Sequence, residues 1–399
     1  MLIDLAFAAK RGSSATMGFF KNRSFNYIYA HGALQSFAGY GGEAFAFVYL
    51  LKAGITAPIV LLSIACLFGS RLIFRNAVLP VAKRFGLRNS LVFGVLLEAS
   101  TYPILSQVNS ADWKLVAYLT LWAISSSFYW TTYHAYVSLI GDNEHRGTQS
   151  SGVEFIGMLM GIVAPIVTGT LLTYFNPIVA FGVVGLAMAG SAFPLLFTPN
   201  LQIKQVATVP RETRIKAFKI MFADGLRAGS FHFTWLIALF ITLGSSYAGF
   251  GGALSLAGFA GALIGLLTGK MVDQGNGKRA LQIAFFALTL AVLARAFGYS
   301  MVWSAVLANA LAVMVWPIYA TATNARIYNL AKQSVCPLRY HVVAEGGWDL
   351  GTAVSCSISA LLIYLGFGYF WPLAVALIGC ILGYWVLTST FYNSPIPKS

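Results

Sequence analysis

Long apolar runs alternate with short polar stretches along almost the entire chain. A helix that crosses the roughly 30 Å hydrocarbon core of a bilayer needs about 20 predominantly apolar residues in succession, and each run is close to that length or longer. The pattern therefore predicts an all-α protein with twelve transmembrane helices. These helices are expected at residues 24–51, 56–80, 89–108, 113–140, 149–173, 177–197, 227–247, 249–269, 280–298, 301–321, 344–367 and 369–391.

The longest polar interruption falls at the middle of the chain and is strongly basic. It separates six predicted helices from six more, which suggests two pseudo-symmetric six-helix bundles. The basic N-terminal tail either lies on the membrane surface as an amphipathic segment or has no fixed structure. The expected divisions are a tail over 1–23, a bundle over 24–197, a linker over 198–226, a bundle over 227–391 and a tail over 392–399.

Composition supports a membrane location. Of the 399 residues, 58% are hydrophobic and only 10% are charged, whereas soluble domains carry about 25% charged residues. The net charge of +14 does not indicate nucleic-acid binding, because the basic residues lie in short loops between apolar runs. Since basic loops remain on the cytoplasmic side, we expect both termini and the linker to be cytoplasmic, in a bacterial inner or plasma membrane.

Enzyme chemistry has no support in the sequence. The four cysteines are scattered and match neither a metal-binding spacing nor a disulfide framework. The chain has no phosphate-binding loop, so ATP is not the expected energy source, and no serine–histidine–acid set or metal cluster stands out. We therefore expect a protein that is not an enzyme and needs no cofactor.

Two short basic loops occupy equivalent places, between the second and third runs of each half. The later loop resembles the loop signature of the major facilitator superfamily: a glycine, three residues, an aspartate, then a glycine and two basic residues. It has one extra residue between the aspartate and the second glycine. The matching positions are Gly269, Asp273, Gly277, Lys278 and Arg279.

The earlier loop keeps part of the same signature. Arg84, Gly86 and Arg88 are present, but Lys83 stands where the family has its aspartate and Leu79 where it has its first glycine. The resemblance implies a secondary transporter whose two bundles rock about a central site, so that the site opens to each side in turn. It also implies that the later loop joins helix ends on the cytoplasmic side in one state and releases them in the other.

Ionisable residues inside the predicted helices are candidates for function, because each costs about 2.5–3.5 kcal/mol on insertion scales when it lies at mid-bilayer. Glu43 is the strongest candidate. It lies deep in the first run and is flanked by Gly41 and Gly42, which let a ligand or another helix approach. We expect Glu43 to bind and release a proton; the alternative is a fixed structural contact.

The second run carries Arg71 and Arg75 one turn apart. Arginine suits carboxylate or phosphate groups, so one of them could bind an anionic substrate or pair with Glu43 or Glu98. The alternatives are that Arg75 reaches the cytoplasmic interface and that Glu98 braces two helices. Two further arginines have simpler expected roles: Arg227 as an interfacial anchor and Arg295 as a residue that reaches outward.

Three acids near the cytoplasmic helix ends suggest gating. Glu154 begins the fifth helix and is expected to join a charge relay with the basic loops. Glu345 and Asp349 occupy the corresponding part of the eleventh helix. We expect these two to pair with Arg339 or Arg326 and to lock a gate, with a role in substrate binding as the alternative.

Aromatic residues suggest a cavity for an amphipathic solute. Trp130 and Tyr133 in the fourth helix are echoed by Trp316 and Tyr319 in the tenth, and His134 adjoins the first pair. Indole and phenol rings offer flat apolar faces with a polar tip. The alternatives are ordinary interfacial aromatic residues and a buried structural histidine.

The predicted function is secondary active transport of a small organic solute, anionic or amphipathic, coupled to protons. Expected partners are the solute, protons and membrane lipids, and the chain is expected to act as a monomer. Two alternatives remain open. One is a lipid or lysolipid translocator of the same fold, and the other is a non-transporting membrane receptor or assembly partner, which the departures in the earlier loop favour.

Overall fold

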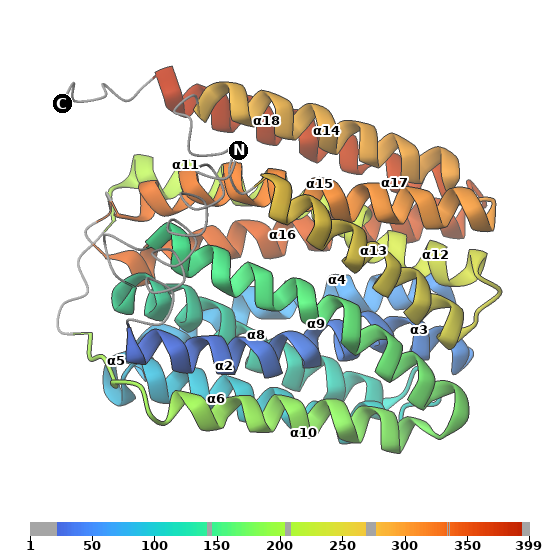
Figure 1. The fold of residues 1–399 in the computed structure, drawn as a ribbon, viewed down its shortest axis with the longest axis horizontal. Coiled ribbons are helices and arrows are strands. Elements are labelled where there is room, and N and C mark those ends of the chain that lie inside the picture. The colour runs from blue at the N-terminus through green and yellow to red at the C-terminus, as the bar shows by residue number, and fades with distance from the viewer. Residues whose placement is uncertain are drawn as a thin grey trace, which may run out of the picture.

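Twelve helical rods lie side by side and fill the molecule (Figure 1). The structure is a computed structural model that describes residues 22–141, 146–203, 209–268, 277–332, 334 and 336–392, and every regular element in these ranges is a helix. The first half forms one side of the molecule and the second half forms the other. The all-α, twelve-helix prediction is confirmed.

The first half contains six rods, three of them built from shorter segments. Its elements are α2 (Arg23–Ala38), η1 (Gly39–Glu43) and α3 (Ala44–Lys52); α4 (Ala57–Phe74), η2 (Arg75–Ala77) and α5 (Val78–Phe85); α6 (Leu87–Ala99) and α7 (Thr101–Leu105); α8 (Trp113–Ile140); α9 (Arg146–Tyr174); and α10 (Pro177–Leu195).

The second half repeats this plan. Its elements are α11 (Arg211–Ala228), η3 (Gly229–Thr234) and α12 (Trp235–Thr242); α13 (Tyr247–Thr268); α14 (Gly277–Gly298); α15 (Val302–Lys332); α16 (Pro337–Tyr364); and α17 (Phe370–Ala374) with α18 (Ala376–Tyr392). We call the end where α2 begins and α18 finishes the basic end, because most of the charged loops lie there.

Eight stretches in the described part of the chain are long and apolar enough to cross a membrane by themselves. The other four rods are α2–α3, α6–α7, α8 and α11–α12. Three of them are interrupted, and α8 carries many serine, threonine and tyrosine residues. These rods are recognised as spans by their place in the assembly.

Helix α11 begins at Arg211, inside the stretch predicted as linker. Glu212 lies in its first turn and pairs with Lys216 at 2.6 Å, and the hydrogen bond from Lys216 lowers the pKa of Glu212. Such i,i+4 pairs support a solvated helical turn. Apolar run length therefore underestimates this helix, because its first turns are polar and project beyond the hydrocarbon.

The two halves follow one register, with equivalent points 190 residues apart. The π-helical turns η1 and η3 begin at residues 39 and 229, and the helices that follow both end before a glycine with positive φ, Gly54 and Gly244. Helices α4 and α13 begin at 57 and 247, and α9 and α16 end at 174 and 364. A repeated fold with interrupted first helices is typical of transporters.

Each π-helical turn is tied to the third rod of its own half. Tyr102 donates its hydroxyl hydrogen bond to the carbonyl oxygen of Ala38 at 3.4 Å. In the second half, Arg295 donates to the carbonyl oxygen of Phe231. Widened turns of this kind leave carbonyl groups poorly paired, and in an apolar surrounding a neighbour must satisfy them.

The two halves meet along two seams, α9 against α13 and α4 against α16. The α9–α13 seam is lined by small residues. A Cβ atom built on Gly258 would lie 2.9 Å from the carbonyl oxygen of Gly161, and one built on Gly251 would overlap the carbonyl oxygen of Pro165. Ser255 donates to the carbonyl oxygen of Ile162 at 2.7 Å. Backbones therefore touch directly across this seam.

We predict that Gly251→Ala lowers stability by about 1–3 kcal/mol, because the added methyl group forces two backbones apart. Gly252→Ala is the matched control, since nothing lies within 4 Å of its built Cβ. Both changes replace glycine with the same better helix former, so their melting temperatures in detergent isolate the seam. Equal melting temperatures would show that this contact is not tight.

Candidate functional site: a charged seam between the halves

The α4–α16 seam carries two buried arginines on the side of the first half. Arg71 lies in the last turn of α4, and Arg75 begins the short turn η2. They are only 4% and 2% exposed. The expectation that Arg75 reaches the interface is therefore wrong: α16 covers its guanidinium group, which donates to the hydroxyl of Thr131 on α8 at 2.8 Å.

Two acids of α16 face these arginines. The Arg71 Nε atom lies 3.2 Å from Asp349 Oδ1, and Arg75 pairs with the other oxygen of Asp349. Glu345 lies 3.6 Å from Arg71 and 3.7 Å from Arg75. These acids were expected to pair with Arg339 or Arg326. Among the described residues they pair with Arg71 and Arg75 and not with Arg339, because α16 turns its acidic face toward α4 of the other half; the side chain of Arg326 lies outside the described residues.

A histidine pair extends the cluster onto α8. His134 Nε2 lies 3.8 Å from Glu345 Oε1, and its ring stacks on that of His341 with centroids 5.5 Å apart. Trp130 stacks on the other side of His134 at 5.7 Å, and Tyr133 packs edge-on against it. Three residues that the sequence singled out as cavity candidates thus adjoin the charged seam.

The cluster is paired in charge but not saturated in hydrogen bonds. Within the described residues, the Nε atoms of Arg71 and Arg75 and the Oδ1 atom of Asp349 are buried without a hydrogen bond, although Arg71 Nε and Asp349 Oδ1 lie 3.2 Å apart as an ion pair. The Arg71 guanidinium lies over the rings of Phe68 and Trp348, 5.1 and 5.9 Å from their centroids. Guanidinium groups have five donors in a fixed fork, so these two retain unused capacity for an oxygen-rich group.

Glu43 and Glu98 add negative charge to the same region. Glu43 ends the turn η1 and is half-buried, and Glu98 on α6 is buried. Both lie within electrostatic range of Arg71 and of each other. In the part of the chain that the structure describes, neither carboxyl group has a hydrogen bond or ion pair, so the bracing role expected of Glu98 has no contact to support it.

The region contains more acidic than basic side chains. Two arginines, Arg71 and Arg75, face four carboxyl groups, those of Glu43, Glu98, Glu345 and Asp349. Unpaired charge inside a low-dielectric interior is strongly unfavourable, and carboxyl groups relieve it by taking up protons. Glu345 and Asp349 are the acids in ion-pair contact, so within the described residues Glu43 and Glu98 are the two carboxyl groups of this set without a cation in contact.

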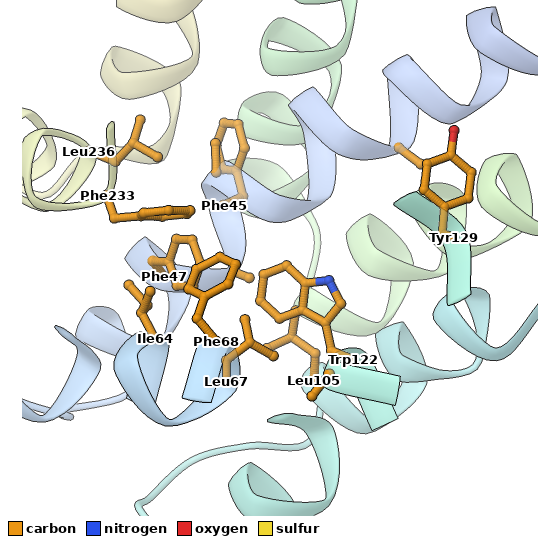
Figure 2. Close-up of a cluster of buried hydrophobic side chains, with 14 of the residues drawn as sticks. Phe45, Phe47, Ile64, Leu67, Phe68, Leu105, Trp122, Tyr129, Phe233 and Leu236 are labelled. Carbon is orange, nitrogen blue, oxygen red and sulfur yellow. The ribbon is translucent and has the colours of Figure 1, made fainter. Parts of the chain in front are cut away.

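An aromatic layer closes the midline next to the cluster (Figure 2). Phe47 of α3 stacks on Trp122 at 5.7 Å and meets Phe233 of η3 edge-on at 5.6 Å. Phe68 lies 5.3 Å from Phe233 and 5.1 Å from Trp348, measured between ring centroids. Rings from both halves therefore interlock, and the structure holds the two halves together at this level.

A model of the Major Facilitator Superfamily matches residues 32–335. The chain belongs to the major facilitator superfamily. It is therefore an integral multi-pass membrane protein and a secondary transporter by family, as predicted, and the family is one of transporters rather than enzymes.

Solved structures of two transporter groups share the fold. A POT family transporter in complex with 5-aminolevulinic acid is 14% identical, with a TM-score of 0.71, and the match covers 95% of this chain and 98% of that one. The human organic anion transporter MFSD10 is 13% identical, with a TM-score of 0.69, covering 92% and 99%. No curated protein matches the chain.

The superfamily loop signatures are only partly visible. Gly269 and Asp273 lie outside the described residues, as do the side chains of Gly277, Lys278 and Glu154, and Arg279 is exposed. In the earlier loop, Gly86 has a φ of 87°, which favours glycine. Arg88 donates to the carbonyl oxygens of Leu196 and Thr198, at 3.2 and 3.0 Å. This loop therefore ties α6 to the end of α10.

A second polar group, inside the second half, was missed by sequence reasoning. Asp224 accepts hydrogen bonds from Tyr319 at 2.6 Å, from Arg227 Nε at 2.9 Å and from Trp348 Nε1 at 3.0 Å. Asp224 falls in the stretch read as linker. Arg227, expected as an interfacial anchor, is buried at 3% exposure because it pairs with this acid.

Trp316 and Tyr319, expected to line a substrate cavity, line a small cavity with Asp224. Its volume is about 60 Å³, enough for about two water molecules at roughly 30 Å³ each but not for an organic solute. The two Trp-x-x-Tyr pairs do not occupy equivalent places in their helices. They are 186 residues apart in sequence, whereas α8 and α15 begin 189 residues apart. The pair in α15 therefore lies nearly one helical turn closer to the start of its helix than the pair in α8.

Arg295 also departs from its expected role. It is 5% exposed and does not reach outward. Its guanidinium lies 4.2 Å from the centroid of Phe231 and donates to Asn309 at 3.1 Å. The guanidinium group of Arg295 thus contacts an aromatic face and neutral acceptors inside the second bundle. Its hydrogen bond to Phe231 supports the turn η3.

We predict that Asp349→Asn lowers the free energy of unfolding by about 3–5 kcal/mol, because two buried arginines lose their shared partner. Removing both sides of one pair, with Arg75→Met and Asp349→Leu together, is expected to lower it far less. Melting temperatures in detergent measure both. Glu212→Gln is the control, since its exposed pair with Lys216 should be thermally silent. A double variant no better than Asp349→Asn would contradict the pairing.

Proposed function

We propose that the protein is a proton-coupled transporter of a small organic solute that carries an anionic group. The observation that supports this most is the seam itself: two buried arginines on one half, paired across the midline with acids of the other half. When the basic ends of the two bundles part, the arginines lose these acids. A solute carboxylate would then take their place on Arg71 and Arg75.

The proton would be carried by Glu43, with Glu98 beside it. Both carboxyl groups lie within electrostatic range of Arg71, so the charge at Arg71 and the protonation of these acids influence each other. Binding of an anion to Arg71 removes the positive charge that favours an ionised Glu43. Anion and proton therefore favour each other's binding, which is the requirement for moving both in one direction.

The similar structures are consistent with such a solute. One holds 5-aminolevulinic acid, and another is an organic anion transporter. We place the basic end on the cytoplasmic side, because basic loops remain there. The Trp130, Tyr133 and His134 side chains would border the solute on the side of α8, and the loop signatures would join helix ends while that side is closed.

We predict that Glu43→Gln abolishes proton-driven accumulation of a carboxylate, with at least a tenfold loss, while solute exchange without a proton gradient persists. An amide cannot release the proton that drives the cycle. Proteoliposomes with an internal pH-sensitive dye and radiolabelled 5-aminolevulinate or glutarate report both fluxes. Glu212→Gln serves as the control, because it removes an exposed carboxyl far from the seam.

Two results would count against this function. Undiminished proton-driven accumulation in Glu43→Gln would transfer the proton to another acid, with Glu98→Gln as the next variant. Movement of fluorescent phospholipid between leaflets, with no carboxylate flux, would favour a lipid translocator instead.

A further inference from the structure

We propose that the charged seam is an exchange site for a small zwitterion: the solute carboxylate replaces Asp349 and Glu345 on the arginines, and the solute ammonium replaces the arginines on Asp349 and Glu345. This deepens the proposed function and rests on it. The proposal names the substrate class, which is a short-chain amino acid with both charges.

The first argument is the segregation of charge between the halves. On the side of the first half, the seam residues in ion-pair contact are both cations, Arg71 and Arg75. On the side of the second half they are both acids, Glu345 and Asp349. When the seam parts, Arg71 and Arg75 lose their acids and Glu345 and Asp349 lose their cations, so with Glu43 and Glu98 protonated the first half is left with surplus positive charge and the second with surplus negative charge.

A solute with only one charge satisfies only one half. A plain carboxylate would pair with the arginines and leave Glu345 and Asp349 without a cation, and an amine would leave the arginines without an anion. Each uncompensated buried charge is strongly unfavourable. A zwitterion compensates both halves at once, so it is the ligand class that stabilises the parted seam most without further protons.

The anion-binding half is held in place without its ionic partners. Thr131 of α8 accepts from Arg75 at 2.8 Å, and Phe68, on the same helix as Arg71, lies under its guanidinium at 5.1 Å. The Nε donor of Arg75 is buried with no hydrogen-bond partner among the described residues, and that of Arg71 contacts Asp349 only as an ion pair. A carboxylate can therefore be received with little rearrangement, which lowers the entropic penalty of binding.

The ammonium-binding half is also fixed within its own bundle. Trp348 lies between the two acids in sequence, and its indole N–H donates to Asp224 at 3.0 Å. Asp224 belongs to the same half, so Trp348 keeps its orientation when the seam opens. Its ring, which now lies beside Arg71, then offers an aromatic face to an ammonium group next to two carboxylates.

The other buried ion pair does not have this property. Asp224 and Arg227 are both on α11 and remain together whatever the two halves do. Tyr319 and Trp348 further satisfy the carboxylate of Asp224. Among the residues that the structure describes, only the α4–α16 seam distributes opposite charges over parts that must separate.

The test compares solutes of equal chain length that differ only in charge. Purified full-length protein is titrated with γ-aminobutyrate, butyrate and butylamine, and with β-alanine, propionate and propylamine, and thermal shift gives apparent affinities. We expect a zwitterion in at least one set to bind tenfold or more tightly than both of its singly charged analogues. Unlabelled zwitterion should also compete with radiolabelled solute in proteoliposomes.

Variants assign the ammonium to its site. In Glu345→Gln, zwitterion affinity should fall about tenfold while carboxylate affinity does not fall, and Glu345→Asp should restore the preference. Glu345 is chosen because its ion pairs are longer than those of Asp349, so the fold is expected to survive. Arg71→Lys should weaken carboxylate and zwitterion equally. Asp224→Asn tests whether Trp348 orientation matters for zwitterions alone.

The outcomes separate this inference from the proposed function. If carboxylates bind and are transported as well as the matched zwitterions, the exchange site is wrong and anion transport stands. If zwitterions are preferred but Glu345→Gln leaves the preference intact, the site is also wrong. If neither carboxylates nor zwitterions move in proteoliposomes of folded protein, the proposed function fails, and the inference fails with it.

Discussion

Charge pairing across the α4–α16 seam is the constraint on which the rest of the arrangement depends. Four ionisable side chains, each at most 10% exposed, meet where the protein shields them from solvent. Leaving one of two buried partners alone is far more unfavourable than having neither. The charges of the seam are therefore compensated in two arrangements: the closed one of this structure, and a parted one in which other groups supply the missing charges. Parting of the seam thus requires that such charged groups bind.

The second seam shows what the first would be without charge. At α9–α13, glycine backbones touch and one serine hydroxyl bridges them. In the repeat register, Arg71 corresponds to Gly261 and Asp349 to Leu159. The arrangement of the backbone is therefore repeated in the two halves, whereas the charged residues at these two positions are not. Among the described side chains, separation at α9–α13 exposes no buried charge, so the charge-dependent part of the energy difference between states lies at α4–α16.

The sequence predicted those features that depend on a residue's own helix. Apolar run length located the twelve rods, and Arg71, Glu345 and Asp349 stood out because charge is rare inside such runs. The partners could not be predicted, because they depend on which face of α16 meets α4, and nearby Arg339 was the more obvious choice. Asp224 was missed for a different reason. It lies in a stretch of basic residues that was interpreted as linker, and the structure shows that α11 begins within this stretch, at Arg211.

The interrupted first helices explain how Glu43, the proposed proton carrier, is linked to the seam. In equivalent places, η1 ends at Glu43 and η3 carries Phe233, so one turn places an acid at the midline where the other places a ring. Phe233 packs against Phe47, one turn beyond Glu43, and against Phe68, one turn before Arg71 and Leu72. Tyr102 and Arg295 hold the two turns from the third rods. In the proposed mechanism, a change of charge at Glu43 would act on Arg71 directly through its field, and the interlocked rings offer a second, mechanical route. Because both routes end at the same guanidinium, that mechanism links protonation to the pairing of the seam.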